Sequence, residues 1–163
     1  MDWLFNGLPL HVLLTHFVVI IVPLTAICLV LAAAWPAARR RLGVVTPILA
    51  LSALISVPIT TEAGEALEEQ VQESALSEVH AHLGKDLLPW VIAVFIVALA
   101  HWAWYRFFTG EGRFARTVTS RPVRIAVTVV LIVAIAVVVV GSVVTVVIIG
   151  ESGARAAWEG RIG

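Results

Sequence analysis

The side chains of this 163-residue chain that could do chemistry are five histidines and a small set of carboxylates. Neutral imidazole is the commonest metal ligand in proteins and also an axial ligand of haem iron. Two opposed imidazoles from different helices suit a b-type haem that carries electrons, whereas two imidazoles with a carboxylate suit Zn, Mn or Fe. The candidates for such a site are His11, His16, His80, His82, Glu62, Glu65 and Glu151.

The spacing of these residues requires a site built between helices. On a regular helix, positions 11 and 16 are separated by about 140°, and positions 80 and 82 by about 200°. Neither pair can therefore chelate one ion. The expected ligands are His16 with either His80 or His82, because periodicity leaves the choice between these two open, and the other candidates are secondary. A proton path and plain hydrogen bonding between helices are the alternatives, and the second is the preferred interpretation for His11 and His101.

Four uncharged stretches must position these side chains. Hydrophobic residues make up 60% of the chain and charged residues 13%, against about 25% charged in a typical soluble domain. Four stretches of 19 to 36 residues contain no Asp, Glu, Lys or Arg, and about 20 apolar residues cross a bilayer as a helix. A soluble globule and a disordered chain are therefore excluded. We predict an all-α polytopic membrane protein, a single four-helix bundle over residues 1–163 with spans at 8–34, 44–61, 87–107 and 123–149.

The distribution of charge predicts the orientation of the bundle. The loops at 35–43 and 108–122, with the residues that flank them, hold eight of the eleven basic residues and one of the eleven acidic ones. Short loops rich in Lys and Arg stay in the cytoplasm. We therefore expect both termini and the loop at 62–86 to face outward, on the side of the membrane away from the cytoplasm.

Two further features concern how the spans pack. In the outer loop, apolar residues recur every four positions from Leu67 to Leu83, which predicts an amphipathic helix that ends at Gly84 and lies over the outer mouth of the bundle. The fourth span has almost no polar group to bury, so it is expected to be the most exposed to lipid. Gly141 and Ser142 are its one place for close approach of another helix.

Three segments of the chain resemble a family of bacterial integral membrane proteins, domain of unknown function 2231 (DUF 2231). They are Gly7–Phe17, which contains His11 and His16, then Val79–Gly84, and finally Ile149–Ala154 followed by Trp158. Val12 and Val18 stand where family members often have proline, and Glu151 stands where many have His or Asp. Related domains occur joined to Rieske or cytochrome-type modules, so the resemblance implies a protein of the bacterial inner membrane with a role in membrane electron transfer.

The expected function is electron transfer in the membrane, through haem b or a transition metal held by the outer histidines. Its expected partners are the lipid bilayer and a redox protein or quinone. Association with a second copy of the chain into a homo-oligomer is a further expectation. The alternative is a non-enzymatic accessory or structural membrane protein that binds a partner or lipid. A transporter is a weaker third interpretation, because four short-looped spans form a small pathway. No P-loop, GxGxxG or GxSxG motif is present, and nothing supports nucleic-acid binding.

Overall fold

The computed structural model describes residues 4–5, 7–68, 75–110 and 112–158. Within this part of the chain, four helical segments are long and apolar enough to cross a membrane, which confirms the prediction of an all-α, four-span membrane protein. The long helices are α1 (Leu10–Ala34), α3 (Val45–Glu68), α5 (Leu87–Ala103) and α6 (Arg121–Trp158). The shorter elements are the paired strands β1 (Leu4–Phe5) and β2 (Leu8–Pro9), helices α2 (Pro36–Leu42) and α4 (Ala75–Lys85), and a π-helical turn, η1 (Trp104–Phe108).

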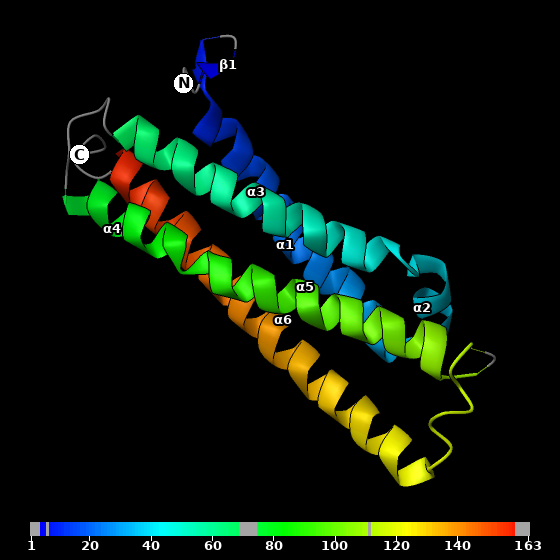
Figure 1. Cartoon of the computed structure of the whole chain (residues 1–163). Helices are drawn as coiled ribbons and strands as arrows, with labels where there is room; N and C mark the ends of the chain where they lie inside the picture. The colour runs from blue at the N-terminus through cyan, green and yellow to red at the C-terminus, as the bar shows by residue number, and fades with distance from the viewer. Residues whose placement is uncertain (1–3, 6, 69–74, 111, 159–163) are drawn as a thin grey trace.

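The four long helices form an up-down-up-down bundle (Figure 1). Helix α1 contacts α3, α3 contacts α5, α5 contacts α6, and α6 closes the ring against α1. Sequential helices in such a bundle are antiparallel neighbours. At one end the start of α1 meets α4 and the end of α6; we call it the histidine end, because His11 and His80 lie there. The opposite end, the arginine end, holds Arg39 of α2 with Arg121 and Arg124 of α6.

Two of the long helices continue beyond the apolar stretches that predict them. Helix α3 continues past position 61 to Glu68, and α6 continues past position 149 to Trp158. Hydropathy marks the apolar part of a helix, whereas Ala, Glu and Arg are good helix formers that extend it into water. Glu62, Glu65 and Glu151 therefore lie on helices, and the phase of each helix decides which way they point.

The amphipathic helix expected between the second and third spans is present as α4, with different bounds. Leu67 belongs to the last turn of α3, and Val71 lies outside the described residues. Helix α4 continues through Gly84, its expected end, and a turn at Asp86 separates it from α5. Figure 1 shows α4 nearly in line with α5. The third span is thus extended beyond its apolar part, and this extension carries His80.

Helix α6 is packed least, as expected for the most lipid-exposed span. Its buried residues are Ile135, Val138, Ser142 and Val146. Gly141 has no room for a side chain, because a Cβ atom there would overlap the Trp90 ring of α5. The hydroxyl of fully buried Ser142 donates to the carbonyl oxygen of Val139 at 3.2 Å, so the polar group is satisfied within its own helix. The predicted close approach at Gly141 and Ser142 is confirmed.

Candidate functional site

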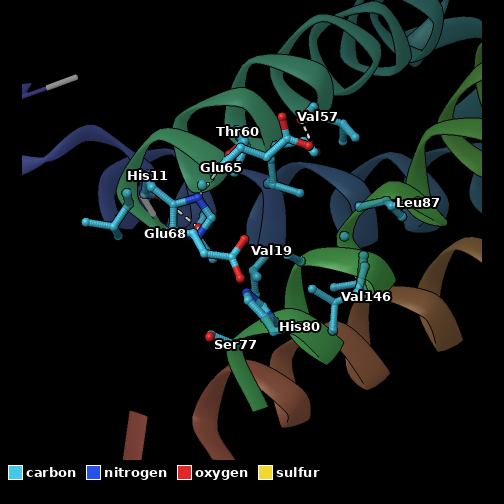
Figure 2. A pocket seen from close by; sticks show the side chains of 18 residues that line it. His11, Val19, Val57, Thr60, Glu65, Glu68, Ser77, His80, Leu87 and Val146 are labelled. Atoms are coloured by element: carbon cyan, nitrogen blue, oxygen red, sulfur yellow. Dashed lines mark hydrogen bonds between the residues drawn. The ribbon is translucent and has the colours of Figure 1, made fainter. Parts of the chain in front are cut away.

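A cavity of about 180 Å³ lies at the histidine end, among α1, α3, α4 and α6 (Figure 2). Apolar side chains form most of its wall, for example Val57 of α3, Leu87 of α5 and Val146 of α6. His11 and His80 are the histidines that line it. Their ring centroids lie 6.3 Å apart with the planes at 84°, so the two imidazoles face one cavity from different helices.

The ring of His11 is oriented by helix α3. Its Nδ1 lies 2.9 Å from the carbonyl oxygen of Thr60, and because a carbonyl only accepts, Nδ1–H must be the donor. The neutral ring therefore has its lone pair at Nε2. Thr15 Oγ1 lies 3.3 Å from this Nε2, but the Thr15 hydroxyl donates to the carbonyl oxygen of His11 at 2.7 Å. The Nε2 of His11 thus remains available as an acceptor.

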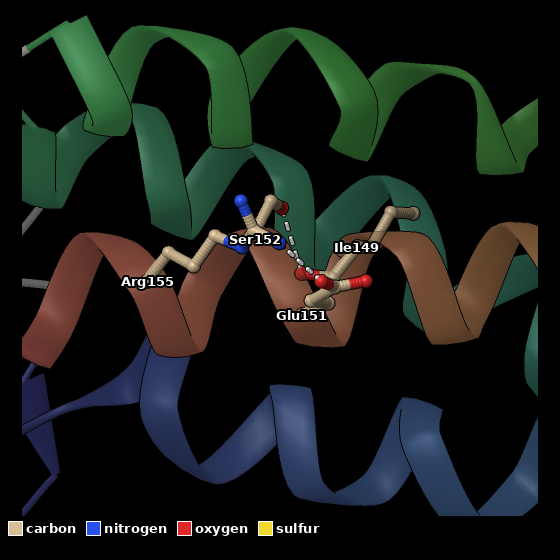
Figure 3. Close-up of polar contacts among 4 residues, drawn as sticks. All are labelled: Ile149, Glu151, Ser152 and Arg155. Carbon is tan, nitrogen blue, oxygen red and sulfur yellow. Dashed lines mark hydrogen bonds and ion pairs between the residues drawn. The ribbon is translucent and has the colours of Figure 1, made fainter. Parts of the chain in front are cut away.

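The ring of His80 is oriented in the same way by helix α6. Its Nδ1 lies 2.9 Å from Ser152 Oγ, whose own proton is donated to the carbonyl oxygen of Ile149 at 2.8 Å (Figure 3). Ser152 Oγ must therefore accept from the Nδ1–H of His80. This second ring also has its lone pair at Nε2. Both imidazoles are thus fixed in one tautomer by partners on neighbouring helices, as metal-binding and catalytic histidines commonly are.

Two glycines allow the helices to approach these rings. A Cβ atom at Gly64 of α3 would lie 2.8 Å from Cε1 and Nδ1 of His11. A Cβ atom at Gly153 of α6 would lie 2.9 Å from Cε1 of His80. Each imidazole is therefore packed against a bare stretch of helix backbone, and any larger residue at either glycine would displace the ring.

Two carboxylates of α3 line the cavity. Glu65 Oε1 forms an ion pair with Nζ of Lys85 at 2.9 Å, and both side chains are about half exposed. Glu68 points toward His80 in Figure 2 and interacts with it electrostatically. Glu68 therefore provides a proton acceptor beside the His80 ring.

The remaining candidates do not join this site. His16 is exposed on α1, its Nδ1–H donates to the carbonyl oxygen of Val12 at 2.6 Å, and it does not line the cavity. His11, which the sequence suggested only as a secondary candidate, lines the cavity in the place that was expected for His16. The exposed residues His82 and Glu62 also lie off the cavity wall. Glu151 is exposed and pairs with Arg155 one helical turn later, at 2.6 Å (Figure 3).

The arrangement bears on the expected metal or haem site. Within the described residues, no group of three or more His, Cys, Asp or Glu side chains could hold a metal ion. Two imidazoles alone could serve as axial ligands of haem, but a porphyrin is several times larger than one six-membered ring. A cavity of about 150 Å³ accommodates benzene, so the present volume matches a ligand of a single ring.

Several residues of the site do not stand out in the sequence. Thr60, Ser152, Gly64 and Gly153 are common residue types in membrane helices, and only their positions opposite His11 and His80 give them a role. One signal could have revealed two of them, because Ser152 and Gly153 belong to the segment Ile149–Ala154 that the sequence analysis singles out. His11 and His80 line the cavity, and Ser152 and Gly153 lie against the His80 ring.

The fold and this site define a helical membrane protein of four spans with a histidine-lined apolar cavity at one end. No family model, curated protein or solved structure matches the chain. The function therefore has to be inferred from the site itself.

Proposed function

We propose that the cavity between His11 and His80 binds the head group of a lipid-soluble quinol, and that the protein serves electron transfer in the membrane. The observation that carries the proposal is the pair of imidazoles on the wall of an apolar cavity, each with its Nδ1–H bonded to a neighbouring helix, at Thr60 and Ser152. Each Nε2 is left as a hydrogen-bond acceptor. A quinol carries two hydroxyl donors at opposite ends of one ring, which is the complement of two acceptors from different helices.

The size and polarity of the cavity support this ligand class. At about 180 Å³ it is suited to one substituted six-membered ring. Small-molecule sites are mostly apolar with a few polar groups that fix orientation, and here those groups are the two imidazoles with Glu68. Oxidation of the quinol would release two electrons and two protons, and Glu68 and the Nε2 of His80 would accept the two protons. The isoprenoid tail of a quinol would extend into the surrounding lipid, since the cavity lies among membrane helices.

The proposed setting follows from the charge distribution. Short loops with excess Lys and Arg stay in the cytoplasm, and the arginine end carries eight of the eleven basic residues. We assign this end to the cytoplasm of a bacterial cell and the histidine end to the outer face of its inner membrane. Electrons from the ligand would then go to a redox partner protein on the outer side.

A second candidate function is the binding of b-type haem or a transition metal by the same two histidines. It is favoured by the Nδ1–H bonds to Thr60 and Ser152, because histidines that ligate metals donate their other ring N–H to a carbonyl or a similar acceptor. For haem, the helices around the cavity would have to move apart. For a metal ion, the two imidazoles would need a further ligand, because no three His, Cys, Asp or Glu side chains of the described residues could hold one ion as they stand.

The test is isothermal titration of the purified protein in detergent with a short-chain benzoquinol, kept reduced under anaerobic conditions, and with the matching benzoquinone. We expect one site per chain and tighter binding of the quinol, because the neutral imidazoles accept hydrogen bonds and the quinone cannot donate them. A reduced-minus-oxidised spectrum and a metal analysis of the same preparation test the second candidate. If no ligand binds and neither haem nor metal is present, the alternative of an accessory protein stands instead.

The Gly153→Ala variant should weaken quinol binding about threefold without unfolding the protein. The added Cβ would lie 2.9 Å from the His80 ring, so the ring must shift by a few tenths of an ångström and its bond to Ser152 loosens. A net hydrogen bond contributes roughly 1 kcal/mol, and partial loss gives about this effect. Gly150→Ala, one turn earlier with open space around it, is the matched control. Equal affinity of the two variants would show that the position of His80 does not matter.

A further inference from the structure

A second cavity lies at the arginine end and has a different character. It is open, with a volume of about 740 Å³, and lies between α2, η1 and the first turns of α6. Three guanidinium groups line it, those of Arg39, Arg121 and Arg124. No carboxylate of the described residues lines it. The two ion pairs found among the described residues, Lys85 with Glu65 and Arg155 with Glu151, do not involve these three arginines. Its charge is therefore strongly positive.

One guanidinium is held in place by an aromatic ring. Arg39 lies over the face of Tyr105, with its Cζ atom 3.6 Å from the ring centroid. Such a cation–π contact orients the cation while leaving its N–H donors free for another acceptor. Arg39 is thus fixed at the wall of the cavity opposite the arginines of α6.

A buried donor on the same wall has no partner. Trp104 is only 8% exposed, and its Nε1–H makes no hydrogen bond within the described residues. Trp104 lines the cavity, and leaving such a donor unpaired is costly. Thr119 also lines the cavity with a hydroxyl group, whereas the hydroxyl of Thr109 donates to the carbonyl oxygen of Tyr105 at 3.1 Å. The cavity thus offers hydrogen-bond donors, together with positive charge, to an acceptor-rich anion.

The part of the cavity toward the middle of the bundle is apolar. Ile125 and Val129 of α6 line it, each about half exposed. Figure 1 shows the first half of α6 diverging from α5 toward this end. A chain of methylene groups could follow these side chains into the bilayer, whereas a free anion would make no use of them.

We propose that this cavity binds one anionic phospholipid. Its phosphate lies among Arg39, Arg121 and Arg124, and the upper part of an acyl chain lies along Ile125 and Val129. Basic pockets between membrane helices commonly bind phosphorylated head groups, and planar guanidinium groups match phosphate oxygens well. The lipid would also fill the space between α5 and α6 and hold the free end of α6 against the bundle.

The test is native mass spectrometry of the purified protein with added phosphatidylglycerol or phosphatidylcholine. We expect one phosphatidylglycerol retained per chain, and at least about tenfold weaker retention in the Arg121→Gln/Arg124→Gln variant, since each arginine near a phosphate contributes about 1 kcal/mol. Arg113→Gln/Arg116→Gln is the matched control, because both arginines are exposed and lie off the cavity wall. This control should retain the lipid as the wild type does.

Two comparisons separate a built lipid site from general attraction of charge. Inorganic phosphate at millimolar concentration should displace little phosphatidylglycerol if the acyl chain contributes, whereas full displacement would mean that a free phosphate site is present instead of a lipid site. Equal retention of phosphatidylcholine, or equal weakening by the two double variants, would overturn the proposal. Circular dichroism of each variant shows that the helices are intact.

Discussion

His80→Ala should weaken binding of a short-chain quinol by about tenfold, whereas His82→Ala should leave it unchanged. The two histidines lie on the same helix two residues apart, but His80 lines the cavity and donates to Ser152 at 2.9 Å, while His82 is exposed. Loss of His80 removes one acceptor for the ligand and leaves a void beside Glu68. The size of the effect follows from one hydrogen bond to the ligand, at about 1.4 kcal/mol per tenfold change.

The same comparison can be made on helix α1. His11→Ala should weaken quinol binding to a similar extent, and His16→Ala should not, because His16 is exposed and bonded only to Val12 of its own helix. Isothermal titration of the four single variants measures this pattern directly. Equal losses for all four, or losses limited to His16 and His82, would contradict the assignment of the cavity.

Gly141→Ala should destabilise the bundle by about 1–3 kcal/mol. The Cβ atom would overlap the rigid ring of Trp90, so α5 and α6 would have to separate, and overpacking of this kind costs about that much. The ordinary benefit of alanine over glycine in a helix, about 1 kcal/mol, offsets only part of it. For a chain of this size, a loss of 1 kcal/mol lowers Tm by roughly 2–4 °C.

The thermal unfolding of the purified variants in one detergent checks this prediction. Gly150→Ala is again the matched control, because no atom lies within 4 Å of a Cβ at that position, and its Tm should stay equal or rise. Combining Gly141→Ala with Trp90→Leu should restore part of the lost stability by removing the ring. A Gly141→Ala protein as stable as the control would mean that α5 and α6 do not pack closely there.

The fold could be predicted from hydropathy because membrane spans must be long and apolar. The ends of the helices could not, since the segments from Glu62 to Glu68 and from Glu151 to Trp158 contain charged residues yet are still helical. Ala, Glu and Arg favour a helix in these segments, but they are not apolar enough as a group for hydropathy to mark the helix. The extensions matter here because they carry Gly64, Ser152 and Gly153 to the rings of the two histidines.

The sequence predicts a site at the end of the bundle where the cavity lies, but it does not identify which histidines line that cavity. The sequence excluded chelation by His11 with His16, or by His80 with His82, and so required partners on different helices. It could not decide which member of each pair faces the bundle, because that depends on the rotation of α1 and α4 about their axes. The His11 ring points inward because its Nδ1–H bonds to the carbonyl oxygen of Thr60 and the ring packs against Gly64. His16 then lies on the exposed side of α1.

The most direct measurement of the central claim is a side-by-side titration of the wild-type protein and the His11→Ala/His80→Ala variant with a reduced short-chain benzoquinol. Our account predicts one site per wild-type chain and at least about tenfold weaker binding in the double variant, whose helical content is unchanged by circular dichroism. Quinol binding of equal affinity in both proteins, or no binding to the wild type, would contradict it.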